Sequence, residues 1–273
     1  MTNAQTHLEK AIQIQPEFAD AHYELALILK ANGENDRSIE HLLKTIEIQP
    51  EFSKAHFHLA LLYKDMEDTK SSCKHFGRAI DLNQNFANAH YHYGLLLADI
   101  EEYEEAKNNL GKATDIDQNY SLAYYNLAKL LIDPEDYEVA KKNYLTAIDI
   151  DQSLAEAHYY LGKLLSGGLK NDEDGTLVRQ PEYDDAIIHY KRAISINKNY
   201  AKAHYNLALV YKFQKNYKES LQHFERAIKI VNDYAKAHFH LAMLLKETGE
   251  VFGSKDLNPS SDVKKISSAK SKN

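Results

Sequence analysis

The stretch His204–Tyr211 reads H-Y-N-L-A-L-V-Y, and near copies of it recur along the whole chain. Each copy begins with two ring-bearing residues and continues into a mostly aliphatic run. The other copies are His22–Leu29, His56–Tyr63, His90–Leu97, Tyr124–Leu131, His158–Leu165 and His238–Leu245. A segment that returns at a fixed interval predicts stacked structural units, so the repeat overrides the one or two compact domains expected from length alone.

The interval between copies is 34 residues in every unit except one. The predicted full units are 18–51, 52–85, 86–119, 120–153, 154–199 and 200–233. Unit 154–199 is longer by 12 residues, which fall within Ser166–Gln180, a Gly-, Asn- and Asp-rich stretch that predicts a surface loop. Residues 1–17 hold only the second half of a unit, and residues 234–250 only a first half. Residues 251–273 are rich in Ser and Lys and are predicted to be a disordered basic tail.

Each half-unit has the apolar spacing of a helix. We count the residue after each unit boundary as position 1, so Ala201 is position 1 and Tyr234 is position 34 of the last full unit. In Ala201–Phe213 the apolar positions 4, 7, 8 and 11 share one face and positions 5 and 9 an adjacent one, so this helix needs cover on more than one side. Tyr217–Ile230 has a narrower stripe, which predicts an outer helix. The pattern therefore predicts an all-α array of antiparallel helix pairs with about 14 helices.

Composition limits the classes of function. The net charge of −7 argues against binding to a phosphate backbone, and no apolar run approaches the length of a membrane span. No secretory signal opens the chain, and the one cysteine, Cys73, excludes a disulfide within it. No nucleophile elbow, phosphate-binding loop, dinucleotide fingerprint or zinc-protease motif is present. We therefore expect a cytoplasmic, non-enzymatic protein without a cofactor that binds neither nucleic acid nor membrane.

The units resemble the tetratricopeptide repeat (TPR) family, whose 34-residue pattern fixes an aromatic residue, Leu-Gly, Tyr, Ala, Phe and Pro. The matching residues are His204, Leu207, Ala208, Tyr211, Ser220, Phe224 and Ala227 in one unit, Ala186, Tyr190 and Ala193 in another, and Pro16 and Pro50. The main departure is histidine in place of tryptophan at position 4. The resemblance implies a right-handed superhelix in which first helices line a concave groove and second helices form the convex side.

All fourteen histidines lie in three columns, at positions 4, 6 and 23. Residues two apart on a helix, such as His90 and His92, point about 200° apart, so the two cannot chelate one ion together. We predict no metal site and interpret columns 4 and 23 as packing, with metal binding or pH sensing as alternatives.

By the family resemblance, positions 2, 5, 9, 12 and 13 face the groove. Position 5 is aromatic in every unit, lysines stand at positions 9 and 12, and asparagine at position 6 bonds the ligand backbone in peptide-binding members. Aromatic rings bury area at low entropic cost and lysines attract acidic groups, so we predict an extended peptide or a helix as ligand. The alternative is that the rings only pack between adjacent first helices. The predicted ligand-binding residues are Tyr91, Tyr125, Tyr159, Tyr205, Asn126, Asn206, Lys129 and Lys163.

The leading hypothesis is a non-catalytic protein-interaction scaffold whose groove binds a peptide or a partner segment. One alternative is a self-assembling structural protein that stacks through apolar flanks at His7–Gln15 and His238–Leu245, which would make it a homo-oligomer; the chain start or the tail could instead cover these flanks. The other alternative, implied by the resemblance, is a targeting arm that works with a separate glycosyltransferase-type enzyme.

Overall fold

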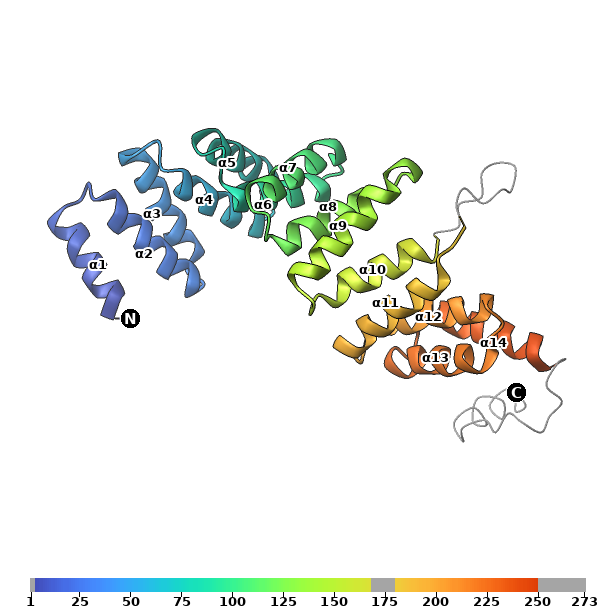
Figure 1. Ribbon diagram of the computed structural model, residues 1–273. Helices are drawn as coiled ribbons and strands as arrows, with labels where there is room; N and C mark the ends of the chain where they lie inside the picture. Colours follow the sequence, from blue (N-terminus) through green and yellow to red (C-terminus); the bar gives the residue numbers. More distant parts are fainter. Residues whose placement is uncertain (1–2, 168–179, 250–273) are drawn as a thin grey trace. The chain divides into compact units, whose positions relative to one another are not determined.

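A computed structural model describes residues 3–167 and 180–249, so most of the predicted loop and the whole predicted tail lie outside the described residues. Within those ranges the protein consists of fourteen α-helices and one 3-10 helix, without a strand, which confirms the predicted all-α class (Figure 1). The helices are α1 (Asn3–Ile14), α2 (Ala19–Ala31), α3 (Asn35–Ile48), α4 (Ser53–Asp65), α5 (Thr69–Leu82), α6 (Ala87–Asp99), α7 (Tyr103–Ile116), α8 (Ser121–Leu130), η1 (Pro134–Asp136), α9 (Tyr137–Ile150), α10 (Ala155–Leu165), α11 (Tyr183–Ile196), α12 (Ala201–Phe213), α13 (Tyr217–Ile230) and α14 (Ala235–Gly249).

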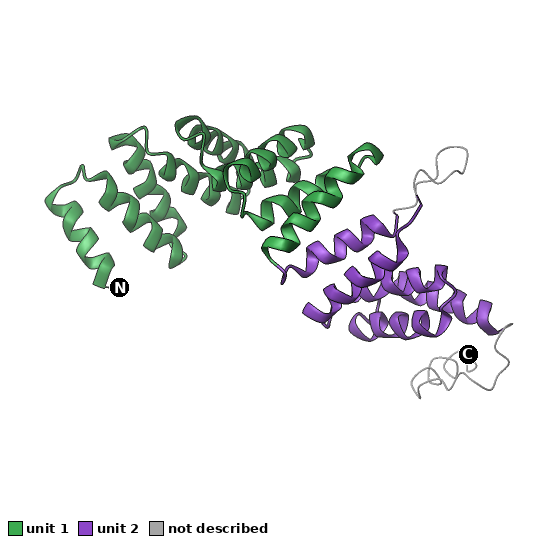
Figure 2. Ribbon diagram, in the orientation of Figure 1, with its two compact units in different colours: residues 1–151 green, residues 152–273 purple. Residues whose placement is uncertain are grey.

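The helices form two compact units that divide after Asp151 (Figure 2). Unit 1 contains α1–α9 and unit 2 contains α10–α14. In both, each first helix packs most extensively on the second helix that follows it, as α4 does on α5 and α12 on α13. Each second helix then contacts the next first helix of its unit, as α5 does α6. Each unit is therefore a stack of helical hairpins.

The core of each hairpin lies where the second helix covers the first. Positions 20, 24 and 27 of the second helix are buried in all six complete pairs, and position 24 holds the large side chain. These large residues are Leu42, Phe76, Leu110, Tyr144, Tyr190 and Phe224. Burying one such side chain contributes about 1.5–3 kcal/mol, so the hairpin interface carries much of the stability.

Close approach of the two helices depends on small residues at positions 8 and 20. Ser220 Oγ donates a hydrogen bond to the Ala208 carbonyl over 2.8 Å, and serine at position 20 makes the same bond in two other pairs. At position 8 of α6 even a methyl group is too large, because a Cβ on Gly94 would lie 2.8 Å from Leu110 Cγ.

Tight turns join the helices of a pair. The residue at position 15 has a positive φ in four pairs, at Gly33, Glu67, Glu101 and Lys215. This left-handed conformation costs little for glycine and more for the three other residues. The α8–α9 pair differs because α8 ends early and η1 replaces the tight turn.

Candidate partner-binding face of the first helices

The aromatic residues at position 5 are mostly buried. Six of them expose only 7–9% of their surface: Tyr23, Phe57, Tyr91, Tyr125, Tyr159 and Tyr205. Five of these rings, all except Tyr125, pack on the aromatic residue at the next repeat boundary, with ring centroids 4.7 Å apart for Tyr91 and Tyr120 and 5.0 Å apart for Tyr159 and Tyr200. Helix packing therefore uses most of the ring surface, and little more than the hydroxyl-bearing edge of a tyrosine is left for a ligand.

Two of the predicted asparagines contact these tyrosine hydroxyls. Asn126 Nδ2 donates to Tyr91 Oη over 3.3 Å and to the Leu122 carbonyl over 2.9 Å, and Asn206 Nδ2 donates to Tyr159 Oη over 3.0 Å. Position 6 of one unit thus meets position 5 of the preceding one. Both asparagines use Nδ2 inside the protein, and this fixes the orientation of the amide and leaves Oδ1 as the acceptor for an outside donor.

Histidines take the place of asparagine at three other junctions. His58 lies beside Tyr23, His92 beside Phe57 and His240 beside Tyr205, with ring centroids 5.7–5.8 Å apart. Burial and then neighbouring lysines lower the pKa of His58 and His92 to about 4. These position-6 side chains are therefore uncharged at neutral pH.

The two predicted lysines at position 9 are exposed. Lys129 Nζ lies 5.3 Å from the centre of the Tyr125 ring, and Lys163 Nζ lies 6.0 Å from that of Tyr160. The predicted residues fall into two sets. Tyr91, Tyr125, Asn126 and Lys129 belong to unit 1, and Tyr159, Lys163, Tyr205 and Asn206 belong to unit 2.

Two of the four lysines at position 12 form ion pairs within the protein. Lys64 Nζ lies 3.5 Å from Asp99 Oδ2, and Lys212 Nζ lies 3.4 Å from Glu247 Oε2. In both cases the acid stands at position 13 of the next unit. The attraction of acidic ligands by the position-12 lysines stays a prediction, and in these two cases the acidic neighbour competes with such a ligand for the lysine.

The histidine columns at positions 4 and 23 form pairs that the sequence reasoning missed. The Nδ1 atoms lie 2.9–3.0 Å apart in His22–His41, His56–His75, His158–His189 and His204–His223. His22 Nε2 also donates to the Pro16 carbonyl over 3.0 Å, so its Nδ1 accepts the bond from His41. The signal was present in the sequence as a fixed spacing of 19 residues, lengthened to 31 in the unit with the insertion.

Three histidines of these pairs have a strongly lowered pKa. Burial, and next the partner histidine, lower the pKa of His75, His158 and His223 to about 4. Among the described residues no group of three or more His, Cys, Asp or Glu side chains is arranged to hold a metal ion. The pairs link the two helices of a hairpin through a hydrogen bond between imidazole rings.

The fold and this face define a helical-repeat protein in which stacked hairpins present a column of first helices. Family models for the tetratricopeptide repeat match residues 7–40, 53–86, 87–120, 122–154 and 201–234, and a TPR repeat model matches 176–214. The chain belongs to the tetratricopeptide repeat family. No curated protein matches the sequence.

Several solved structures share the fold. YrrB, a TPR protein with an unusual peptide-binding site, is 22% identical over 73% of this chain and 96% of its own, with a TM-score of 0.60. PilF of Pseudomonas aeruginosa is 19% identical over 82% of this chain and 97% of its own, with a TM-score of 0.66. MamA is 21% identical over 69% of this chain and 96% of its own, with a TM-score of 0.56. At these identities the likeness concerns the fold. None of the described helices is long and apolar enough to cross a membrane.

Proposed function

We propose that this protein is a non-catalytic scaffold that binds an extended, acidic segment of a partner protein along the exposed face of its first helices. Membership of the TPR family supports the general role, and the peptide-binding site of YrrB is a precedent on the same fold. The segment lies across positions 6 and 9 rather than on the flat faces of the position-5 rings, because those faces are buried.

The fixed asparagine amides carry this proposal. In α8 the Asn126 Nδ2 bonds hold its side chain in place, so that Oδ1 is the atom left to accept a peptide N–H. Lys129 stands three residues further on, on the same face of the helix, and is exposed. A side-chain oxygen that accepts a backbone N–H of the ligand, next to a cation, suits an extended peptide with a carboxylate side chain. Asn206 in α12 is held in the same way by Tyr159.

A random peptide library displayed on phage tests this proposal without knowledge of the natural partner. We expect the protein to select peptides enriched in Asp and Glu and to bind them more weakly as salt rises. Affinities of the selected peptides are then measured for Lys129→Ala/Lys163→Ala. A charge-assisted bond contributes about 1.5–3 kcal/mol, so the double variant should lose about tenfold or more in affinity.

The matched control is Lys112→Ala/Lys229→Ala, which removes the same charge from exposed positions on the second helices α7 and α13. It should bind peptides like the wild type. Equal loss in both double variants would show a non-specific charge effect and reject the proposed face, as would a library selection without enrichment. The role as a targeting arm for a glycosyltransferase-type enzyme stays a prediction, since no observation favours it.

A further inference from the structure

The last described helix, α14, is a first helix without the second helix that covers its equivalents. Phe239 at position 5 is 59% exposed, whereas the six equivalent aromatic residues expose 7–9%. Ala242 at position 8 is exposed, whereas Ala208 is fully buried. Leu245 at position 11 is also exposed, whereas Leu29 is buried. Among the described residues, therefore, nothing covers the face of α14 that the other first helices turn to a second helix.

The helix α1 has the complementary defect. It follows the second-helix pattern, with Ala4, His7, Leu8 and Ala11 at positions 20, 23, 24 and 27. Positions 20, 24 and 27 are buried in every complete pair. In α1, by contrast, Ala4 and His7 are exposed, and Leu8 and Ala11 are only half-buried.

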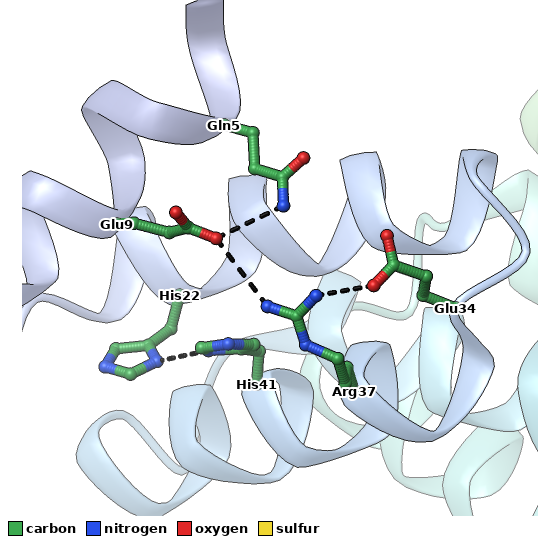
Figure 3. Close-up of polar contacts among 6 residues, drawn as sticks. All are labelled: Gln5, Glu9, His22, Glu34, Arg37 and His41. Carbon is green, nitrogen blue, oxygen red and sulfur yellow. Dashed lines mark hydrogen bonds and ion pairs between the residues drawn. The ribbon is translucent and has the colours of Figure 1, made fainter. Parts of the chain in front are cut away.

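Another side of α1, which carries Gln5 and Glu9, faces the next hairpin (Figure 3). Gln5 is 2% exposed and donates to Glu9 over 3.2 Å, and Glu9 lies 3.6 Å from Arg37 of α3. In the same view His22 and His41 form the position 4–23 pair of the hairpin α2–α3. The helix α1 is thus ordered by its neighbours and still presents the face that normally meets a first helix.

We infer that α14 of one molecule and α1 of a second molecule form a composite hairpin and link the molecules head to tail. The register supports this pairing at the position 5–24 and 8–20 contacts of the complete hairpins and at the histidine pair that four of them contain. His238 stands opposite His7 at positions 4 and 23, Phe239 opposite Leu8 at positions 5 and 24, and Ala242 opposite Ala4 at positions 8 and 20. His238 Nε2 already donates to the Asn232 carbonyl over 2.9 Å, so its Nδ1 is oriented as in the histidine pairs.

The residues that follow α14 in the sequence fit this register poorly. They would place Asn258 at position 24 and Pro259 at position 25. The complete units carry Leu, Phe or Tyr at position 24. Position 25 lies inside the second helix, where proline removes a hydrogen bond and clashes with the preceding turn. The sequence of α1 satisfies every one of these positions, so the second copy is the better occupant.

The two surfaces are different, so the contact is heterologous. Such a contact leaves one unused surface at each end of a dimer, and association continues with rising concentration until a ring closes or an open chain forms. The contact buries α14 and α1 and uses neither Lys129 nor Lys163. Its failure can therefore be distinguished from failure of the proposed peptide-binding face.

Sedimentation velocity of the full chain from low to high micromolar concentration tests the inference. We expect the weight-average sedimentation coefficient to rise with concentration. Phe239→Asp on α14 and Leu8→Asp on α1 should each remain monomeric, because a buried unpaired carboxylate is strongly unfavourable. Phe213→Asp is the matched control, since Phe213 is 58% exposed at the end of α12 and should leave association unchanged.

Mixing the two interface variants gives the decisive result. Leu8→Asp retains an intact α14 and Phe239→Asp retains an intact α1, so the mixture should form a dimer with one copy of each and nothing larger. Ala4→Cys mixed with Ala242→Cys, both in a Cys73→Ser background, should form a disulfide-linked dimer. A chain that stays monomeric at every concentration, or a mixture without the dimer, would overturn the inference.

Discussion

The helices α12 and α14 begin with almost the same sequence, AKAHYNLA and AKAHFHLA, but several of their equivalent side chains differ in burial. Tyr205 is buried in α12, and Phe239 at the same position of α14 is exposed. The neighbours account for this difference. The helix α13 covers α12 and inserts the fully buried Phe224 against Tyr205, with ring centroids 5.9 Å apart, and the Tyr234 ring packs on Tyr205 from the other side.

The comparison shows that the burial of a side chain in this array depends on the neighbouring helices as well as on the sequence of its own helix. The same apolar side chain is core where a second helix follows and surface where none does. Stability in such arrays is approximately a sum of unit and interface terms. Substitutions in the hairpin α12–α13 should therefore reduce the free energy of unfolding more than substitutions in α14. The difference between the two losses measures the contribution of the covering helix.

The largest difference is expected between Phe224→Ala and Phe239→Ala. Removing a fully buried phenylalanine leaves a cavity and costs about 3–5 kcal/mol. Removing the exposed Phe239 should cost less than about 1 kcal/mol, since its ring is already largely in water. Urea unfolding followed by circular dichroism at low protein concentration measures both. Equal losses in the two variants would contradict the view that α14 lacks a cover.

The stability of the protein should depend on pH through its histidine pairs. The hairpin α12–α13 contains such a pair, whereas α14 has no partner histidine among the described residues. Burial lowers the folded-state pKa of His75, His158 and His223 to about 4, below the ordinary value near 6.5. Their contribution to stability is therefore fully present above about pH 6.5 and is lost as the pH falls toward 4. We expect a lower Tm at pH 5.0 than at pH 7.5.

Asparagine at position 23 offers a variant that keeps a hydrogen bond without a second titrating ring. Asn109 naturally takes this place opposite His90, with Asn109 Oδ1 3.0 Å from His90 Nδ1. The variant His75→Asn/His189→Asn/His223→Asn should show a smaller fall in Tm between pH 7.5 and pH 5.0. His7→Asn, which alters an exposed position-23 histidine, is the control and should retain the wild-type fall. If the triple variant loses as much Tm between pH 7.5 and pH 5.0 as the wild type, the histidine pairs are not the cause of the pH dependence.

In the hairpin α6–α7 the covering helix leaves no room for a methyl group at position 8. Gly94→Ala would place Cβ 2.8 Å from Leu110 Cγ, and overpacking costs about 1–3 kcal/mol against a gain of about 1 kcal/mol in helix propensity. We expect a net loss of about 1 kcal/mol. Gly111→Ala, in α7 with no atom within 4 Å of the added Cβ, should instead gain up to about 1 kcal/mol. Chemical denaturation measures the free energy of unfolding, which should fall for Gly94→Ala and rise for Gly111→Ala.

Most of the fold could be predicted from the sequence because its determinants are local and periodic. The 34-residue interval and the apolar spacing within each half-unit indicate helix pairs without knowledge of any contact. The local pattern left open whether Tyr205 packs or faces a ligand, because part of its cover, Tyr234, lies at the boundary to the next unit. Asp99 likewise neutralises Lys64 from the following unit. In both cases the deciding contact depends on how successive hairpins stack, and a single repeat does not contain that information.

The smallest effect concerns the tyrosine hydroxyls that hold the asparagine amides. Tyr159→Phe keeps the buried ring and removes only the oxygen that Asn206 contacts, so it should cost about 0.5–1.5 kcal/mol. Tyr23→Phe is the matched control, because His58 and not asparagine stands beside that ring and Phe57 occupies the same position in the next unit. It should change the free energy of unfolding by less than about 0.5 kcal/mol.

If the proposed function is correct, Tyr159→Phe should also weaken peptide binding, because Asn206 loses the contact that orients its Oδ1. Tyr23→Phe should leave peptide binding unchanged. Equal peptide affinities in both variants would mean that the hydroxyl contact contributes to stability alone and that the ligand is held by other groups.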